Sequence, residues 1–164
     1  MKRITATLCM AALAVASYAQ QWAPVGENIR SPWAEQVDPA NPLPEYPRPQ
    51  MVRADWQNLN GLWNYAVTEA AAESFTAEGK ILVPFAIESS LSGVGKRITK
   101  ENAVWYERQF TVPKKWKGKN VFLHFGAVDY EANIYINGKK AGFHKGGYSS
   151  FKIDVTEFLT EGEN

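Results

Sequence analysis

Two carboxylates of the second half of the chain, Asp129 and Glu131, are the residues whose type and spacing come nearest to acid–base chemistry. Two positions apart in an extended strand, they point to the same side with Cβ atoms about 7 Å apart. A pair on one exposed face cannot flank both sides of a bond that is to be cleaved. It also lacks the apolar burial that raises the pKa of a carboxyl group. The sequence therefore predicts no catalytic residue in this chain.

The two histidines offer weaker chemistry. His144 is expected opposite Glu131 in the hairpin register given below. There the pair either lines the mouth of a pocket or forms a surface ion pair worth under about 1 kcal/mol. His124 lies on a strand whose other face is apolar, so we expect it to be buried against another layer. Two histidines give no metal-ligand spacing, and no metal or other cofactor is predicted.

The element that must position these side chains is a β-hairpin around Asn137-Gly138. Asn-Gly favours a type I′ turn because both central residues take positive φ. With this turn, cross-strand partners are Ile136 with Lys139, Ile134 with Ala141, and Ala132 with Phe143. Partners share a face, so the predicted apolar face is Ala132, Ile134, Ala141 and Phe143. The other face holds Asn133, Tyr135, Lys140 and Gly142. The register brings residues 126–131 and 144–148 together at one end.

Short alternating runs predict five further strands, around residues 62–68, 80–84, 104–112, 121–125 and 151–155. The first of them is expected to bury one face. About seven short strands without a long helical period indicate an antiparallel sandwich or barrel. Residues 154–159 read as a strand end that continues into one helical turn, and 161–164 as a tight turn. Such a turn normally leads into another strand, so we expect this chain to be the front piece of a longer protein.

Arginine and tryptophan side chains on these strands have structural interpretations. Arg108 alternates with Tyr106 and Phe110, and we expect it to pair with a carboxylate in or beside the sandwich. Tryptophans at strand spacing belong more often to a core than to a stacking platform for a ligand. We therefore expect Trp56, Trp63 and Trp105 to be core residues.

The first nineteen residues have the pattern of a secretory signal. Lys2 and Arg3 precede an apolar run, and Ser17-Tyr18-Ala19 forms a small-x-small cleavage site. A lipoprotein signal at Cys9 is the alternative, but too few residues precede it. The prediction is export to the periplasm or the medium without a membrane anchor.

Cleavage at this site leaves 20–50 as a proline-rich extended lead-in and 51–164 as one folded domain. The lead-in holds seven of the nine prolines and is expected either to be disordered or to lie on a neighbouring domain. Cys9 is the single cysteine of the sequence, so the chain that remains after cleavage cannot form a disulfide. Cleavage also removes two cations, which lowers the formal net charge from +1 to about −1. Neither nucleic acid nor an anionic membrane is therefore an expected partner.

Six short motifs occur in one order between Leu59 and Asn164: Leu59-Asn60-Gly61-Leu62-Trp63, Val83-Pro84-Phe85, the run 104–110, Phe125-Gly126-Ala127-Val128-Asp129, Asn137-Gly138 and the run 144–151. In this order and with these gaps, they resemble the N-terminal sugar-binding domain of glycoside hydrolase family 2. The family holds β-galactosidases, β-glucuronidases and β-mannosidases. The resemblance implies an all-β, antiparallel jelly-roll sandwich of the galactose-binding-domain type, lacking its last strand here.

In complete family members, an immunoglobulin-like domain and a TIM barrel follow this domain. The barrel carries both catalytic glutamates, together with an Asn-Glu pair and a His-Tyr-Pro signature. Residues 51–164 contain neither of these motifs. The resemblance therefore implies a domain that is inactive alone and completes the substrate pocket of an exported β-galactosidase-like enzyme. Its partners would be an oligosaccharide substrate and the downstream domains; a homo-oligomer is left open.

Asp129 is the residue for which the resemblance implies substrate contact, with His144 as a second candidate. A carboxylate accepts strong hydrogen bonds from two neighbouring sugar hydroxyls. Some β-glucuronidases place an acidic residue where this chain has Gly126. That difference favours a neutral sugar such as galactose. The alternatives are an Asp129 that caps a turn and, for the whole chain, a free-standing carbohydrate-binding or adhesive module. A module would need a row of exposed aromatic side chains, and the predicted polar face of the hairpin offers only Tyr135.

Overall fold

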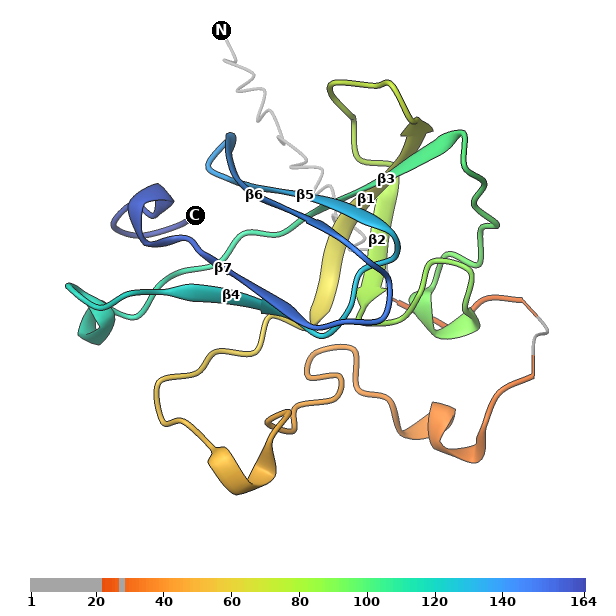
Figure 1. Ribbon diagram of the computed structural model, residues 1–164. Helices are drawn as coiled ribbons and strands as arrows, with labels where there is room; N and C mark the ends of the chain where they lie inside the picture. Colours follow the sequence, from red (N-terminus) through yellow and green to blue (C-terminus); the bar gives the residue numbers. More distant parts are fainter. Residues whose placement is uncertain (1–21, 27–28) are drawn as a thin grey trace, which may run out of the picture.

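The computed structural model describes residues 22–26 and 29–164, and the predicted signal segment lies outside them. Within these residues the regular structure consists of seven strands and five short 3-10 turns, without an α-helix (Figure 1). No helix in the described residues is long and apolar enough to cross a membrane. The strands are β1 (Gly61–Glu69), β2 (Gly79–Val83), β3 (Asn102–Glu107), β4 (Phe122–Phe125), β5 (Glu131–Ile136), β6 (Lys139–Lys145) and β7 (Phe151–Asp154). The prediction of an all-β, antiparallel fold is confirmed.

The strands form three antiparallel groups, in the orders β2-β1-β3, β4-β7 and β5-β6. The β5–β6 ribbon crosses in front of the β2-β1-β3 sheet, and β4-β7 runs beside it (Figure 1). Near the last residues, the backbone N–H and C=O of Asn164 both bond to Phe110, at 2.9 and 3.0 Å. The predicted single helical turn is the 3-10 turn η5 (Thr156–Phe158).

Strand β1 is buried on both faces, whereas one buried face was expected. Tyr65 packs with Ile81 and Ile87 on one face, while Ala66 on the other face is 1% exposed. The segment after β2 explains the difference, because it folds back over the first face. This segment contains the turn η3 (Ser90–Ser92), and its Ile87, Val94 and Ile98 pack on the cluster.

The hairpin turn is confirmed, but the predicted register holds only for the pairs next to the Asn137-Gly138 turn. Asn137 and Gly138 both have positive φ, 51° and 74°. Ile136 pairs with Lys139 as expected, but an irregularity between Ile134 and Tyr135 shifts every later pair by one residue. The observed partners are Ile134 with Gly142, Asn133 with Phe143, Ala132 with His144 and Glu131 with Lys145.

The shift exchanges the faces of two predicted side chains. Phe143 is turned outward and is 51% exposed, while Gly142 takes its place on the inner face. The physical reason is the approach of β7: a Cβ on Gly142 would lie 2.7 Å from Cδ1 of Ile153. Only a residue without a side chain leaves room for Ile153 at this position.

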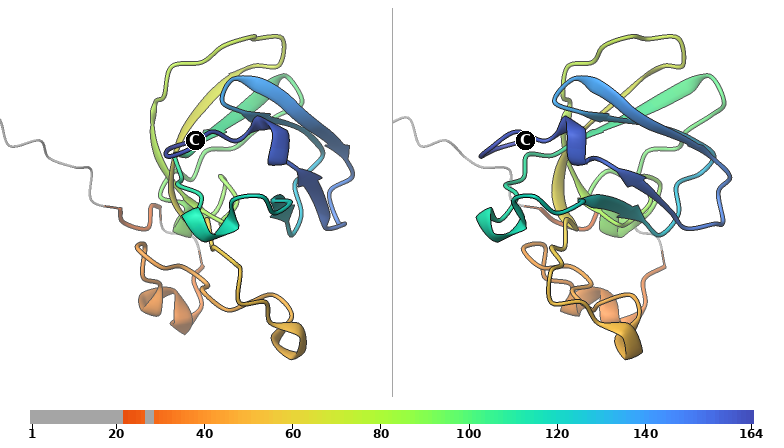
Figure 2. Two further views of the ribbon diagram at one scale, coloured as in Figure 1. Left: turned by 90° about the vertical axis from the view of Figure 1, so that its left-hand side faces the viewer. Right: turned by 60° about the vertical axis from the view of Figure 1, so that its left-hand side comes forward.

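The lead-in lies along one end of the sandwich, as Figures 1 and 2 show from three directions (orange). It includes two 3-10 turns, η1 (Pro32–Gln36) and η2 (Pro49–Met51). Nε1 of Trp22 donates to the carbonyl of Leu91 at 3.1 Å, and Pro42 is fully buried. The lead-in therefore contacts its own domain, and the part that the structure describes has an ordered path there.

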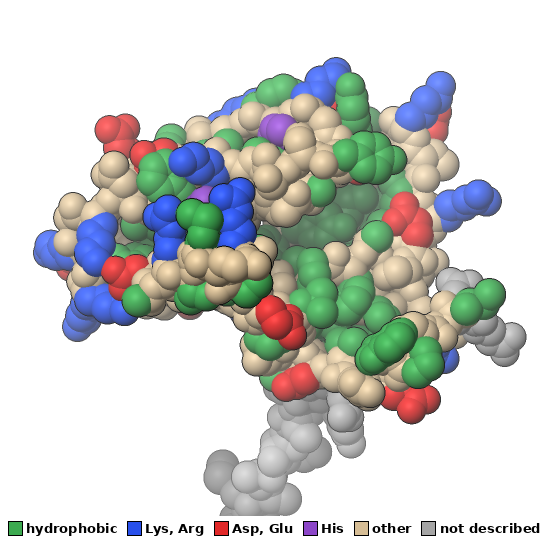
Figure 3. Space-filling model, turned by 60° about the horizontal axis from the view of Figure 1, so that its bottom comes forward, with side chains coloured by type: hydrophobic (Ala, Val, Ile, Leu, Met, Phe, Trp, Pro, Cys, Tyr) green, Lys and Arg blue, Asp and Glu red, His purple; other side chains and the backbone are tan. Residues whose placement is uncertain are grey.

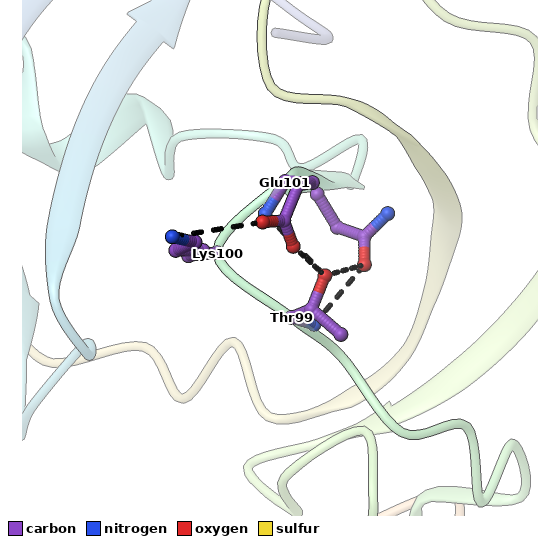
Figure 4. A network of polar contacts seen from close by, with 4 residues as sticks. Thr99, Lys100 and Glu101 are labelled. Atoms are coloured by element: carbon purple, nitrogen blue, oxygen red, sulfur yellow. Dashed lines mark hydrogen bonds and ion pairs between the residues drawn. The ribbon is translucent and has the colours of Figure 1, made fainter.

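The loop that enters β3 is held by local polar contacts. The Thr99 hydroxyl bonds to the carboxylate of Glu101 at 2.6 Å and to the side-chain oxygen of Asn102 at 3.1 Å (Figure 4). Lys100 pairs with Glu101 at 3.9 Å. The charges of Lys100 and Glu101 offset each other, and the hydrogen bonds of Thr99 account for the turn without a ligand.

Candidate functional site

Two loops meet at one end of the hairpin, as the sequence predicts. We call them the tip loops: residues 126–130 between β4 and β5, and residues 146–150 between β6 and β7. The backbone N–H of Gly146 donates to the carbonyl of Tyr130 at 2.8 Å. The side chain of Asp129 lies against Gly147, where an added Cβ would be 2.4 Å from Oδ1 of Asp129. The absence of a side chain at Gly147 thus leaves room for the carboxylate of Asp129.

Asp129 itself is exposed and points away from the core. Among the described residues, no hydrogen bond or ion pair reaches its carboxylate, so no turn-capping bond is present there. The peptide bond that follows it, Asp129–Tyr130, is cis. An exposed carboxylate held against backbone keeps its acceptor positions for a ligand. Substrate contact by Asp129 stays a prediction.

Lys145, rather than His144, is the partner of Glu131. The Lys145 ammonium forms an ion pair with Glu131 and lies 5.2 Å from the ring centre of Tyr130. Tyr130 is 57% exposed, and Tyr148 in the other loop is completely exposed. Sequence reasoning missed these three side chains. Lys145 could have been found only with the correct register, whereas Tyr148 follows the Gly146-Gly147 pair that was noted for its permissive backbone.

His144 lies on the inner face of the hairpin, which corrects the expectation of a pair with Glu131. The one-residue shift places it opposite Ala132 and turns its ring toward β7. The ring stacks on Phe151 at 3.9 Å between centres, and Phe151 stacks on Phe125 at 4.7 Å. Its Nε2 lies 3.2 Å from the carbonyl of Gly146 and 3.4 Å from the Ser149 hydroxyl. His144 therefore supports the second tip loop, and its contact with substrate stays a prediction.

His124 and Arg108 also differ from expectation. His124 is exposed on the outer face of β4 rather than buried, because the strand has no second layer there except the ring of Trp56 at 5.7 Å. Partial burial and the cations Lys152, Arg53 and Arg48 lower the pKa of His124. Arg108 donates to the backbone carbonyl of Asn60 at 3.1 Å, and no carboxylate in the described residues pairs with it.

The tryptophans are engaged by protein groups. Trp63 packs on the core cluster and donates to the carbonyl of Leu59 at 2.8 Å. Trp105 stacks on Phe75 at 5.1 Å. Trp56, in contrast, packs on Tyr46 of the lead-in at 4.8 Å and lies outside the core cluster.

Among the residues that the structure describes, the tip has no group of side chains that could hold a catalytic metal. The residues described hold no cluster of three His, Cys, Asp or Glu side chains that could bind a metal. A shallow pocket lies at the opposite end of the β4-β7 pair, lined by Asn120, Asp154, Thr156, Glu157 and Phe158. The Asp154 carboxylate there is already bonded to the backbone and hydroxyl of Thr156, which lowers its pKa.

Comparison with known proteins agrees with this arrangement. Residues 83–164 match the model of the glycosyl hydrolases family 2 sugar-binding domain, and this chain belongs to that family. A β-galactosidase of Thermoanaerobacter pseudethanolicus is 45% identical over 58 residues, which are 35% of this chain and 8% of that protein. A β-glucuronidase of Streptococcus agalactiae is 30% identical over 103 residues, 61% of this chain and 17% of that protein.

Solved structures give the same result. A β-glucuronidase of Lactobacillus rhamnosus superimposes with a TM-score of 0.54 at 33% identity, over 66% of this chain and 20% of that one. A β-glucuronidase of Faecalibacterium prausnitzii gives a TM-score of 0.53 at 30% identity, over 65% and 19%. The chain thus spans a fifth or less of the length of these relatives.

Proposed function

We propose that this chain is the noncatalytic sugar-binding domain of an exported family 2 enzyme that hydrolyses terminal β-glycosidic bonds. The domain completes the substrate pocket of that enzyme through its tip loops. The observation that carries the proposal is the Asp129 carboxylate, which is exposed, held against Gly147 and without a protein hydrogen bond in the described residues. Two neighbouring hydroxyls of a sugar ring are matched donors for such a group.

The substrate that we propose is a β-glucuronide rather than a β-galactoside. Gly126, in place of the acidic residue of some β-glucuronidases, favours a neutral sugar. However, most of the relatives described above are β-glucuronidases, including both solved structures.

The test is the substitution Asp129→Ala in the full-length protein, assayed on aryl β-glucuronide and aryl β-galactoside. We expect kcat/KM to fall about tenfold to a thousandfold, a loss of roughly 1.4–4 kcal/mol of transition-state stabilisation. Glu73→Ala, which removes an exposed carboxylate in the turn after β1, is the matched control and should leave kcat/KM unchanged. Equal activity of the Asp129→Ala variant would remove this residue from the site. Absence of hydrolysis of both substrates by the unsubstituted protein would overturn the proposed activity.

A free-standing carbohydrate-binding module is the second candidate. The observed hairpin register supports it better than the predicted register, which left only one aromatic ring on the outer face. The outer face of the hairpin now shows two exposed rings, Tyr135 at 48% and Phe143 at 51% exposure. The ammonium of Lys140 lies 5.7 Å from the ring centre of Phe143. Micromolar binding of a neutral glycan by this chain alone on a glycan array, abolished by Phe143→Ser, would support the module over the pocket-completing domain.

A further inference from the structure

The outer face of the β4-β7 pair carries cations and aromatic rings that the proposed function does not use. His124 of β4 and Lys152 of β7 are cross-strand partners, so their side chains share this face. The Lys152 ammonium lies 4.8 Å from the ring centre of Phe122. Leu123, Phe125, Phe151 and Ile153 point the other way, because side chains alternate along each strand.

The segment 46–56, where the lead-in joins the folded domain, adds two further cations to this face. Trp56 packs beside His124, which brings the segment 46–56 against β4. The positive charges of Arg48 and Arg53 in this segment help to lower the pKa of His124. We call the set Arg48, Arg53, Trp56, Phe122, His124 and Lys152 the cationic face. In Figure 3, Lys and Arg side chains gather around hydrophobic and histidine side chains on this side of the molecule.

Two carboxylates near the residues of the cationic face already have partners in the protein. Asp154, opposite Phe122, is bonded to Thr156 at 2.5 and 3.0 Å. Asp55 forms ion pairs with Lys115 and Lys119, at 2.9 and 2.5 Å. In the described part of the chain, no ion pair joins Arg48, Arg53 or Lys152 to a carboxylate. Asp154 keeps its negative charge beside Thr156, so the three cations Arg48, Arg53 and Lys152 outnumber the one carboxylate on this face.

We propose that the cationic face is a second saccharide-binding surface, which takes an acidic glycan chain carrying carboxylates. The apolar CH face of a sugar ring can lie on Phe122, which is 39% exposed, while Arg48, Arg53 and Lys152 bond to sugar carboxylates. The proposal goes beyond the proposed function, because it involves neither Asp129 nor hydrolysis. A nucleic acid fits less well, because a strand would need a longer basic track than this short face.

The probe is an α-linked tetramer of galacturonic acid, titrated into the full-length protein, with maltotetraose as the neutral match. The α-linkage keeps the probe out of a site for terminal β-glycosides. We expect binding of the acidic tetramer alone, weakening about tenfold when the salt rises from about 50 to about 500 mM. Binding of both tetramers with equal affinity, or of neither, would overturn the proposal.

Substitutions then place the binding on this face. The double variant Arg53→Gln/Lys152→Gln keeps both long side chains and should weaken binding about tenfold or more, since two charge-assisted bonds are lost. Lys100→Gln/Lys139→Gln, which removes two exposed cations elsewhere, is the matched control. Unchanged binding by the first variant would contradict the proposal. So would equal binding of a single-stranded oligonucleotide. Hydrolysis of an aryl glycoside should be the same in the unsubstituted protein and in both double variants, which separates this test from that of Asp129.

Discussion

Asp129 and Gly147 come from different loops, and the carboxylate of the first lies against the backbone of the second. The sequence indicates that the two loops meet, because an Asn-Gly turn fixes which ends of a hairpin are adjacent. It does not indicate which residue of the second loop lies beneath the carboxylate. That contact depends on the exact path of both loops, and the structure shows that Gly147 fills this role.

Gly147→Ala tests this contact at the scale of one methyl group. The new Cβ would lie 2.4 Å from Oδ1 of Asp129, so the carboxylate must move. On the proposal that Asp129 contacts substrate, we expect kcat/KM of the full-length protein to fall about tenfold, because a misplacement of about 1 Å at a substrate contact is costly. The double variant Gly147→Ala/Asp129→Ala should be no worse than Asp129→Ala alone, because the two changes act on one interaction. Additive losses would show that Gly147 acts independently of Asp129.

At the scale of elements, the β5–β6 hairpin shows how packing between strands overrides a pattern within them. Alternation predicted Phe143 inside, and a single shift of register places it outside with Gly142 inside. The shift places Gly142 beside Ile153 of β7 and so leaves room for the Ile153 side chain. Alternation within the hairpin carries no information about this residue of another strand. The same shift moves His144 to the inner face and Lys145 opposite Glu131.

Gly142→Ala should therefore destabilise the fold although alanine suits a strand better than glycine. Its methyl group would overlap Ile153, with Cβ 2.7 Å from Cδ1, and overpacking of this kind costs about 1–3 kcal/mol of unfolding free energy. Chemical denaturation measures the change. Gly126→Ala is the control, because an added Cβ there meets nothing within 4 Å. Equal midpoints for the two variants would show that β7 moves away without cost.

At the scale of the whole molecule, the lead-in is the part where composition is least informative. Seven prolines predicted an extended path with little helix, but left open whether the segment is ordered. The structure attaches it at separate points: Trp22 donates to Leu91 and would contact any side chain on Gly93, and Asn60 bonds to the carbonyl of Pro42 at 3.3 Å. These contacts make the described part of the lead-in a part of the domain surface.

Trp22→Ala and Trp33→Ala compare an anchored tryptophan with an exposed one in the same lead-in. Trp22 is half-buried and hydrogen-bonded, whereas Trp33 is 70% exposed. We expect Trp22→Ala to lower the free energy of unfolding by about 1–3 kcal/mol and Trp33→Ala to change it little. Urea unfolding followed by circular dichroism measures both. The same small change in both variants would mean that the lead-in does not stabilise the domain.

The amino-acid sequence by itself determined the strand segments, the Asn-Gly turn, the family and the end of the sandwich where Asp129 lies. These features depend on local alternation, turn geometry and short motifs, which are properties of neighbours along the chain. Only the tertiary structure decided the hairpin register, the inward ring of His144, the exposure of His124 and the backbone partner of Arg108. Each of these depends on space and charge supplied by residues far away in the sequence, such as Ile153 at Gly142 and Asn60 at Arg108.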